Sequence, residues 1–202
     1  MVLRQTGAFT VAGDVQFDPA ITDLAGGGFA VAWEESESPY VVKGNIFTRG
    51  GATTGTFSVT GGGDVDQHQP TITALSDGGF AVAWQDEQNP EVIRGNVFTS
   101  SGAQTGTFNV TGNGDDANTQ PTITALSDGG FAVAWQDEEL NDVIQGNVFT
   151  SDGAQTDTFN VTQTDLQKNP TITDLSGAGF AVAWEEVRNP DVIRGNVFTS
   201  DG

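Results

Sequence analysis

Apolar residues alternate in size along one phrase that occurs four times in the chain. Gly-Phe-Ala-Val-Ala-Trp stands at 28–33, 79–84, 130–135 and 179–184. Successive side chains of a strand point to opposite sides, so Phe, Val and Trp share one side and the two alanines share the other. Because neither side carries a polar residue, we expect a strand that is buried on both faces.

Three more strand-like stretches accompany each phrase. The first begins at a proline, as in Pro70–Thr73, and a Ser-Asp-Gly-Gly turn leads from it into the phrase. The third is Val92–Phe98 and the fourth is Phe108–Thr111. The phenylalanines of the phrase are 51, 51 and 49 residues apart, a period typical of four-stranded propeller blades. The sequence therefore predicts an all-β protein, a four-bladed β-propeller.

The repeat also predicts how the ring closes. Phe9–Ala12 matches the fourth stretch of the unit, whereas the last unit ends just after its third stretch, Val192–Phe198. The N-terminal strand is therefore expected to complete the last blade, which would remove open sheet edges. Two closures fit: four blades in a monomer, which we favour, or eight blades in a ring-completing homodimer. In either case residues 1–202 form a single domain.

The charge balance restricts the partners. The chain has 27 Asp and Glu against 7 Lys and Arg, a formal net charge of −20. Such a surface repels phosphate backbones and anionic lipids, so we expect no nucleic-acid partner and instead cations or a basic partner. No apolar run reaches membrane-spanning length, so no membrane insertion is expected, and Met1–Phe9 lacks the pattern of a signal peptide.

Most of the acids fall in two sets of connections that share one face of a propeller, those from the fourth stretch to the first and from the second to the third. Carboxylate oxygens without cysteine suit a hard cation, so Ca²⁺ is the expected ion. A second candidate position for a cation is the central channel, lined by threonines of the first stretch. The competing interpretation is that the acids only keep the protein soluble. The candidate metal ligands are Asp14, Asp64, Asp66, Asp115, Asp116 and Asp165 on the acidic face, and Thr22, Thr73, Thr124 and Thr173 in the channel.

Each tryptophan of the phrase is followed two residues later by a carboxylate. An aromatic ring beside a hydrogen-bond acceptor is a composition typical of sugar pockets. The alternative is that these tryptophans pack in the core, in phase with Phe and Val. The candidate sugar ligands are Trp33, Trp84, Trp135 and Trp184, with Glu35, Asp86, Asp137 and Glu186.

Nothing in the sequence argues for catalysis, so we expect no enzyme. No strained serine turn and no nucleotide-type glycine loop is visible. His68 and Tyr40 are the only histidine and tyrosine, and neither recurs in the other units. His68 is expected in a loop. An enzyme would require an asymmetric pocket, which the repeated pattern does not predict.

The stretch Ser76–Trp84, and its counterpart Ser127–Trp135, resembles the acidic, glycine-rich "DGGF-V-W" repeats of large secreted bacterial proteins. Some of those are surface adhesins or carry RTX-type calcium-binding regions. The resemblance implies an extracellular or cell-surface location and a calcium-associated adhesion role.

These patterns lead to one preferred function and two alternatives. The preferred hypothesis is a non-catalytic binding or adhesion module with an acidic, cation-binding face. The first alternative is a propeller lectin that binds carbohydrate at one site per blade. The second is a purely structural or engineered symmetric propeller, since Pro70–Glu87 and Pro121–Glu138 are identical.

Overall fold

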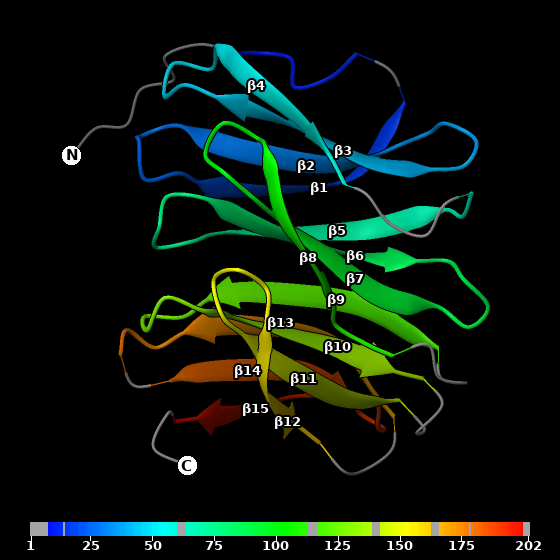
Figure 1. The fold of residues 1–202 in the computed structure, drawn as a ribbon. Coiled ribbons are helices and arrows are strands. Elements are labelled where there is room, and N and C mark those ends of the chain that lie inside the picture. Colours follow the sequence, from blue (N-terminus) through cyan, green and yellow to red (C-terminus); the bar gives the residue numbers. More distant parts are fainter. Residues whose placement is uncertain are drawn as a thin grey trace.

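The computed structural model describes residues 8–13, 15–59, 64–112, 117–138, 142–162, 166–177 and 179–199. These residues form four antiparallel sheets that follow one another along the chain and lie stacked in that order (Figure 1). The prediction of an all-β propeller with four repeated blades is confirmed. Among these residues we find no helix with the length and hydropathy needed to span a bilayer.

Each blade is one sheet, with its strands in sequence order. Blade 1 contains β1 (Gln16–Asp23), β2 (Phe29–Glu35), β3 (Val41–Phe47) and β4 (Thr53–Ser58). Blade 2 contains β5 (Gln67–Ala74), β6 (Phe80–Asp86), β7 (Val92–Phe98) and β8 (Gln104–Asn109). Blade 3 contains β9 (Asn118–Ala125), β10 (Phe131–Asp137), β11 (Val143–Phe149) and β12 (Gln155–Asn160). Blade 4 contains β13 (Gln167–Asp174), β14 (Phe180–Glu186) and β15 (Val192–Phe198).

The first strand of each blade begins earlier than the sequence pattern predicted. β5 starts at Gln67, three residues before Pro70, and its pairing with β6 shifts register between His68 and Thr71. Gln69, inside this bulge, has a φ of 49°. Proline cannot donate a ladder hydrogen bond, so the bulge accommodates it without ending the strand. His68 therefore lies in a strand, and our placement of it in a loop was wrong.

Each blade has two different apolar faces. The face that we call the Phe face carries the Phe, Val and Trp of the phrase, and the Ala face carries its two alanines. The Ala face of one blade packs against the Phe face of the next, as where Ala81 and Ala83 share a cluster with Phe131, Val133 and Trp135. The same arrangement joins blades 1 and 2 and blades 3 and 4. A strand buried on both faces is thus confirmed.

The phenylalanine of the fourth strand joins two blades. Phe108 of β8 lies over Gly95 of its own blade, where an added Cβ would meet the ring's Cζ at 2.0 Å. The same ring contacts Phe131 and Phe149 of the next blade, with centroid distances of 4.9 and 5.1 Å. Phe57 and Phe159 occupy equivalent positions over glycines of β3 and β11.

The expected closure of the ring within one chain is not seen among the described residues. β15 is hydrogen-bonded to β14 alone in its sheet, and blades 1 and 4 lie at opposite ends of the stack (Figure 1). Phe9 instead contacts Phe29 and Phe47 of blade 1, at 5.4 and 5.1 Å between ring centroids. The fourth strand of a blade contacts its own blade and also the following blade. Residues 9–12 contact blade 1 in the second of these two ways, as a strand from a preceding blade would.

The glycine under each phenylalanine gives a direct test of this packing. We expect Gly95→Ala to lower the free energy of unfolding by about 1–3 kcal/mol, because the added methyl group overlaps the Phe108 ring. Gly112→Ala is the matched control, since no atom of the described residues lies within 4 Å of its added Cβ. Urea denaturation measures both variants, and equal stability of Gly95→Ala and the parent would contradict the packing.

Candidate functional site

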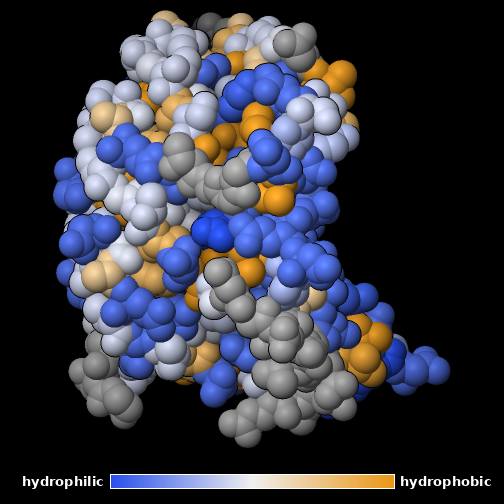
Figure 2. Space-filling view, turned by 45° about the vertical axis from the view of Figure 1, so that its right-hand side comes forward, coloured by the Kyte–Doolittle hydropathy of each residue, from blue (hydrophilic) through white to orange (hydrophobic). Residues whose placement is uncertain are grey.

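The two sets of acidic connections do meet at one edge of the blades. In blade 2 the N–H of Glu87, just after β6, donates to the carbonyl of Asp66, just before β5, at 2.8 Å. Equivalent bonds join Ser36 to Val15 and Glu138 to Ala117. The visible surface is largely hydrophilic, with hydrophobic side chains in small separate patches (Figure 2). The described part of the chain excludes Asp14, Asp115, Asp116 and Asp165, so their predicted role as ligands has no structural counterpart here.

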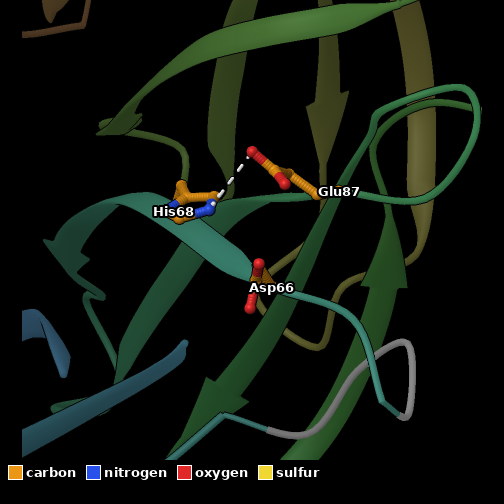
Figure 3. A group of neighbouring side chains, drawn as sticks. All are labelled: Asp66, His68 and Glu87. Atoms are coloured by element: carbon orange, nitrogen blue, oxygen red, sulfur yellow. Dashed lines mark ion pairs between the residues drawn. The ribbon is translucent and has the colours of Figure 1, made fainter. Parts of the chain in front are cut away.

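Between blades 1 and 2 this edge carries a cluster of possible metal ligands. One atom each from Asp66, His68 and Glu87 lies within 4.8 Å of the others (Figure 3). Asp66 and His68 flank the start of β5, and Glu87 approaches from the end of β6. Asp66 was predicted as a metal ligand from its acidic connection, whereas His68 and Glu87 were not. Asp64 is exposed and is not part of this cluster.

Carboxylates flank both nitrogens of His68. Nδ1 lies 2.8 Å from Oε2 of Glu34, whose side chain is 7% exposed. Nε2 lies 3.3 Å from Oε1 of Glu87, which is 47% exposed (Figure 3). Asp66 is held by the backbone, because Tyr40 donates its N–H to Oδ1 at 2.7 Å. One imidazole nitrogen is thus fixed by a buried carboxylate, and the other faces the exposed carboxylate of Glu87.

Aromatic side chains border the same cluster. The ring of Tyr40 lies 5.3 Å from that of His68 and 6.5 Å from that of Phe17, between centroids. Phe17 is 46% exposed. We call the cavity that these groups line the blade 1–2 pocket; its volume is about 570 Å³ and it is lined by Phe17, Asp18, Glu34, Tyr40, Asp66, His68, Gln69, Gln85 and Glu87.

The repeat itself shows that this pocket is exceptional. Where blades 2 and 3 meet, Thr119 stands in the place of His68, and its hydroxyl donates to Glu138 at 3.0 Å. Because His68 and Tyr40 occur once each, the pocket breaks the symmetry of the propeller. Their uniqueness was the signal in the sequence, and an asymmetric pocket was not expected. The residues equivalent to Glu34, Tyr40, Asp66, His68 and Glu87 at the next interface are Gln85, Glu91, Ala117, Thr119 and Glu138.

The channel threonines have structural partners. Thr22 Oγ1 accepts the N–H of Ala74 in the next blade at 3.0 Å, and Thr73 Oγ1 accepts that of Ala125 at 3.0 Å. Thr124 and Thr173 donate to the carbonyls of the residues that follow them. The hydroxyls of Thr22 and Thr73 thus connect neighbouring blades, whereas those of Thr124 and Thr173 bond within their own strands. The role of all four as cation ligands stays a prediction.

The four tryptophans lie in the core, as the alternative interpretation of the sequence held. Trp33, Trp84, Trp135 and Trp184 are 5, 0, 4 and 5% exposed. Trp33 Nε1 donates to Glu35 Oε2 at 3.3 Å. Trp135 and Asp137 also line a cavity of about 480 Å³ beside β11 and β12. Since the tryptophan rings are buried, the hypothesis that these residues bind carbohydrate depends on access through that cavity.

The carboxylates that follow the tryptophans are engaged by the third strand of their own blade. Lys43 Nζ lies 2.8 Å from Glu35, and Arg94 Nε lies 2.7 Å from Asp86, which is fully buried. The side chain of Glu186 pairs with Arg194 and Arg188. In blade 3 the cation is replaced, and Gln145 Nε2 donates to Asp137 at 2.9 Å. Apart from the contact of Arg188, which precedes β15, these contacts join the second and third strands of each sheet.

These pairs shift the pKa values of their members. The hydrogen bond from Lys43 holds the pKa of the Glu35 carboxyl below its ordinary value of 4.5, and it raises the pKa of Lys43 above 10.5. Burial acts to raise the pKa of Glu186, but Arg194 and Arg188 outweigh it and lower that pKa. All three groups are therefore charged near neutral pH.

The Glu35–Lys43 pair predicts a pH dependence. A lowered carboxyl pKa contributes stability above the unfolded value of 4.5, which is lost as the pH falls through the folded pKa. The raised pKa of Lys43 adds stability below 10.5 that is lost at higher pH. Since both side chains are partly exposed, we expect Lys43→Gln to cost about 0.5 kcal/mol near neutral pH.

Thermal unfolding across the pH range measures this effect. The difference from the parent should shrink below pH 4.5 and vanish once the pH has fallen through the lowered pKa of Glu35, where the carboxyl is protonated. Arg49→Gln, at an exposed turn, removes the same charge without breaking this pair and serves as the control. A loss of stability in Lys43→Gln that persists in acid would contradict the assignment of this stability to the Glu35–Lys43 pair. An equal loss in Arg49→Gln would contradict it as well.

Comparison with known proteins supports the fold. The sequence matches no family model and no curated protein. The structure is similar to a GH43 endo-arabinanase from Bacillus licheniformis, with a TM-score of 0.55 at 13% identity, covering 95% of this chain and 75% of that one. It is also similar to the Hadza microbial sialidase Hz136, with a TM-score of 0.60 at 9% identity, covering 92% and 47%.

A third similar structure is a GH62 hydrolase in complex with xylotriose, with a TM-score of 0.52 at 13% identity, covering 100% of this chain and 70% of that one. The chain thus spans less than half of the sialidase and about three-quarters of the arabinanase. At these identities the likeness shows the propeller fold alone.

Proposed function

We propose that this chain is a non-catalytic binding module that holds a divalent cation in the blade 1–2 pocket. The observation that carries the proposal is the convergence of Asp66, His68 and Glu87 on one small volume. The net charge of −20 supports it, since a negative surface raises the local concentration of cations. An extracellular location and an adhesion role, which the resemblance to bacterial repeats implies, belong to the same proposal.

The ligand set favours a different ion from the one first expected. An imidazole beside carboxylates suits Zn²⁺ or Mn²⁺, whereas Ca²⁺ takes oxygen ligands. Glu34 supports this arrangement, because a carboxylate that accepts a hydrogen bond from one ring nitrogen directs the other toward a metal. In this proposal His68 Nε2, Glu87 and Asp66 bind the ion, and Glu34 orients the imidazole.

Titration calorimetry with Zn²⁺, Mn²⁺ and Ca²⁺ in separate runs tests the proposal. We expect saturable binding of one Zn²⁺ or Mn²⁺ per chain, and a melting temperature that rises with the metal concentration. His68→Thr copies the residue at the next interface and should abolish this binding. Glu34→Gln should weaken it by about 10–100-fold, as losses of such orienting groups do.

The repeat supplies a matched control for these variants. Glu138→Gln changes the residue equivalent to Glu87 where Thr119 replaces the histidine, so it should leave metal binding unchanged. No saturable binding by the parent, or equal binding by His68→Thr, would refute the proposal. Turnover of chromogenic glycosides that depends on Glu34 or Glu87 would refute its non-catalytic part.

A second candidate function is carbohydrate binding in the same pocket. The observation that favours it is the pair of aromatic rings, Phe17 and Tyr40, beside carboxylates and the amides of Gln69 and Gln85. The similar structures are named as an arabinanase, a sialidase and a hydrolase bound to xylotriose. Exposed rings with nearby polar groups are a composition that suits sugars.

Xylotriose and arabinan oligosaccharides are the probes for this candidate. We expect Tyr40→Glu, which copies Glu91, and Phe17→Ala each to weaken binding at least about tenfold, the cost of one lost stacking contact. Trp135→Phe keeps the core filled and tests the second cavity. If Trp135→Phe reduced the binding and Tyr40→Glu did not, the sugar site would be assigned to the cavity of blade 3 instead.

A further inference from the structure

The two ends of the blade stack expose surfaces that are buried at every interface inside it. On the Ala face of blade 4, Ile193 is 76% exposed and Val197 is 64% exposed. The equivalent residues of blade 2, Ile93 and Val97, are 0 and 4% exposed. On the Phe face of blade 1, Ile21 is 66% exposed, whereas the equivalent isoleucines of blades 2, 3 and 4 are at most 9% exposed.

Blade 4 has a slot of the shape that a phenylalanine fills elsewhere. In blades 1 to 3, the ring of a fourth-strand phenylalanine lies over the glycine of the third strand, as Phe108 lies over Gly95. Among the described residues, no aromatic atom is within 4 Å of the Cβ position of Gly195, the equivalent glycine of β15. An apolar cavity of about 360 Å³ lies there, lined by residues that include Ala181, Ala183 and Val197.

Residues 9–11 already act as half of a fourth strand. Phe9 contacts the phenylalanine pair of blade 1 as Phe108 contacts that of blade 3. Asn45 Nδ2 donates to the carbonyl of Val11 at 2.8 Å. The equivalent bonds from Asn147 to Val110 and from Asn196 to Val161 measure 2.6 and 2.7 Å. Residues 9–11 thus make the ring contacts and the asparagine hydrogen bond that a fourth strand makes with the following blade.

We propose that a second copy of this chain docks head to tail on blade 4. Residues 9–12 of that copy pair with β15 as its fourth strand, and Phe9 of that copy covers Gly195. Strand addition of this kind satisfies the edge of a sheet. The Phe face of blade 1 in that copy then packs on Ile193 and Val197, as the internal interfaces do.

The same contact made twice closes a ring of two copies and eight blades. A head-to-tail contact forms either a closed ring or an open filament, depending on its rotation. The junction is apolar and each copy carries a charge of −20, so the two copies repel one another at low ionic strength. Salt that screens this repulsion should therefore favour the assembly.

Light scattering after size exclusion, over a range of concentrations in about 0.15 M and 0.5 M salt, tests the proposal. We expect a species of twice the 21.1 kDa chain mass, more abundant at the higher salt. A mass of one chain at every concentration up to about 100 µM would overturn the proposal. The reason is that a ring-closing contact is expected to have a dissociation constant of about 1 µM or lower. A ladder of masses above two chains would overturn the closed ring.

Gly195→Leu is the decisive variant. Its side chain would enter the open cavity of a single copy, so the blade should still fold, but it would occupy the site of the partner's Phe9. We expect at least a tenfold weaker association, with circular dichroism unchanged. Gly112→Ala, at a position with open space around it, should associate like the parent. A Gly195→Leu protein that associates as tightly as the parent would also overturn the proposal.

Discussion

The fold depends on one contact that each blade shares with the next. A phenylalanine from the fourth strand lies over a glycine of its own sheet and against two phenylalanines of the following sheet, as Phe57 does with Phe80 and Phe98. The ring leaves no room for a Cβ at that glycine, so the third strand carries glycine in every blade. Because the ring needs surfaces from two blades, a single blade cannot bury it. Stability therefore belongs to the interfaces, as in other repeat proteins.

This constraint decides where the chain is free to vary. The residues of both apolar faces repeat almost without change, since each must fit the same neighbour. Positions at the strand ends, such as Glu34 and His68, meet across two neighbouring blades at the edge of the interface. They can therefore differ between blades at little cost in packing. The one histidine and the one tyrosine meet there, and the blade 1–2 pocket owes its chemistry to this departure from the repeat.

The sequence predicted most of the fold because its period and alternation record the packing directly. Phe80, Val82 and Trp84 alternate with alanines, and both faces are indeed buried. The start of β5 was not predictable from alternation, because the bulge at Gln69 shifts the register by an irregular step. The role of Phe9 was half predictable. Its alignment with Phe108 identified a fourth strand, but alignment does not say which of two neighbouring blades holds it.

The candidate site was less predictable, because it joins residues from two blades. Asp66 was named from its acidic connection, whereas His68 was assigned to a loop. Tyr40 stands 28 positions before His68 in the chain, and only the contact between their rings brings them together. The burial of the tryptophans was predictable, since they are in phase with Phe and Val on a strand that is apolar on both faces. Recurrence in this protein marks packing, and the departures from recurrence mark the candidate chemistry.

The distribution of basic residues follows from the same division. Lys43, Arg94 and Arg194 occupy one repeated position, and each is paired there with a carboxylate of its own blade. The repeat thus uses three of the 7 basic residues to neutralise acids within its sheets. The acids of the connections then face solvent with few cations to oppose them. That edge therefore has a negative potential for structural reasons. The blade 1–2 pocket adds the imidazole of His68, which together with the carboxylates makes a set of candidate metal ligands.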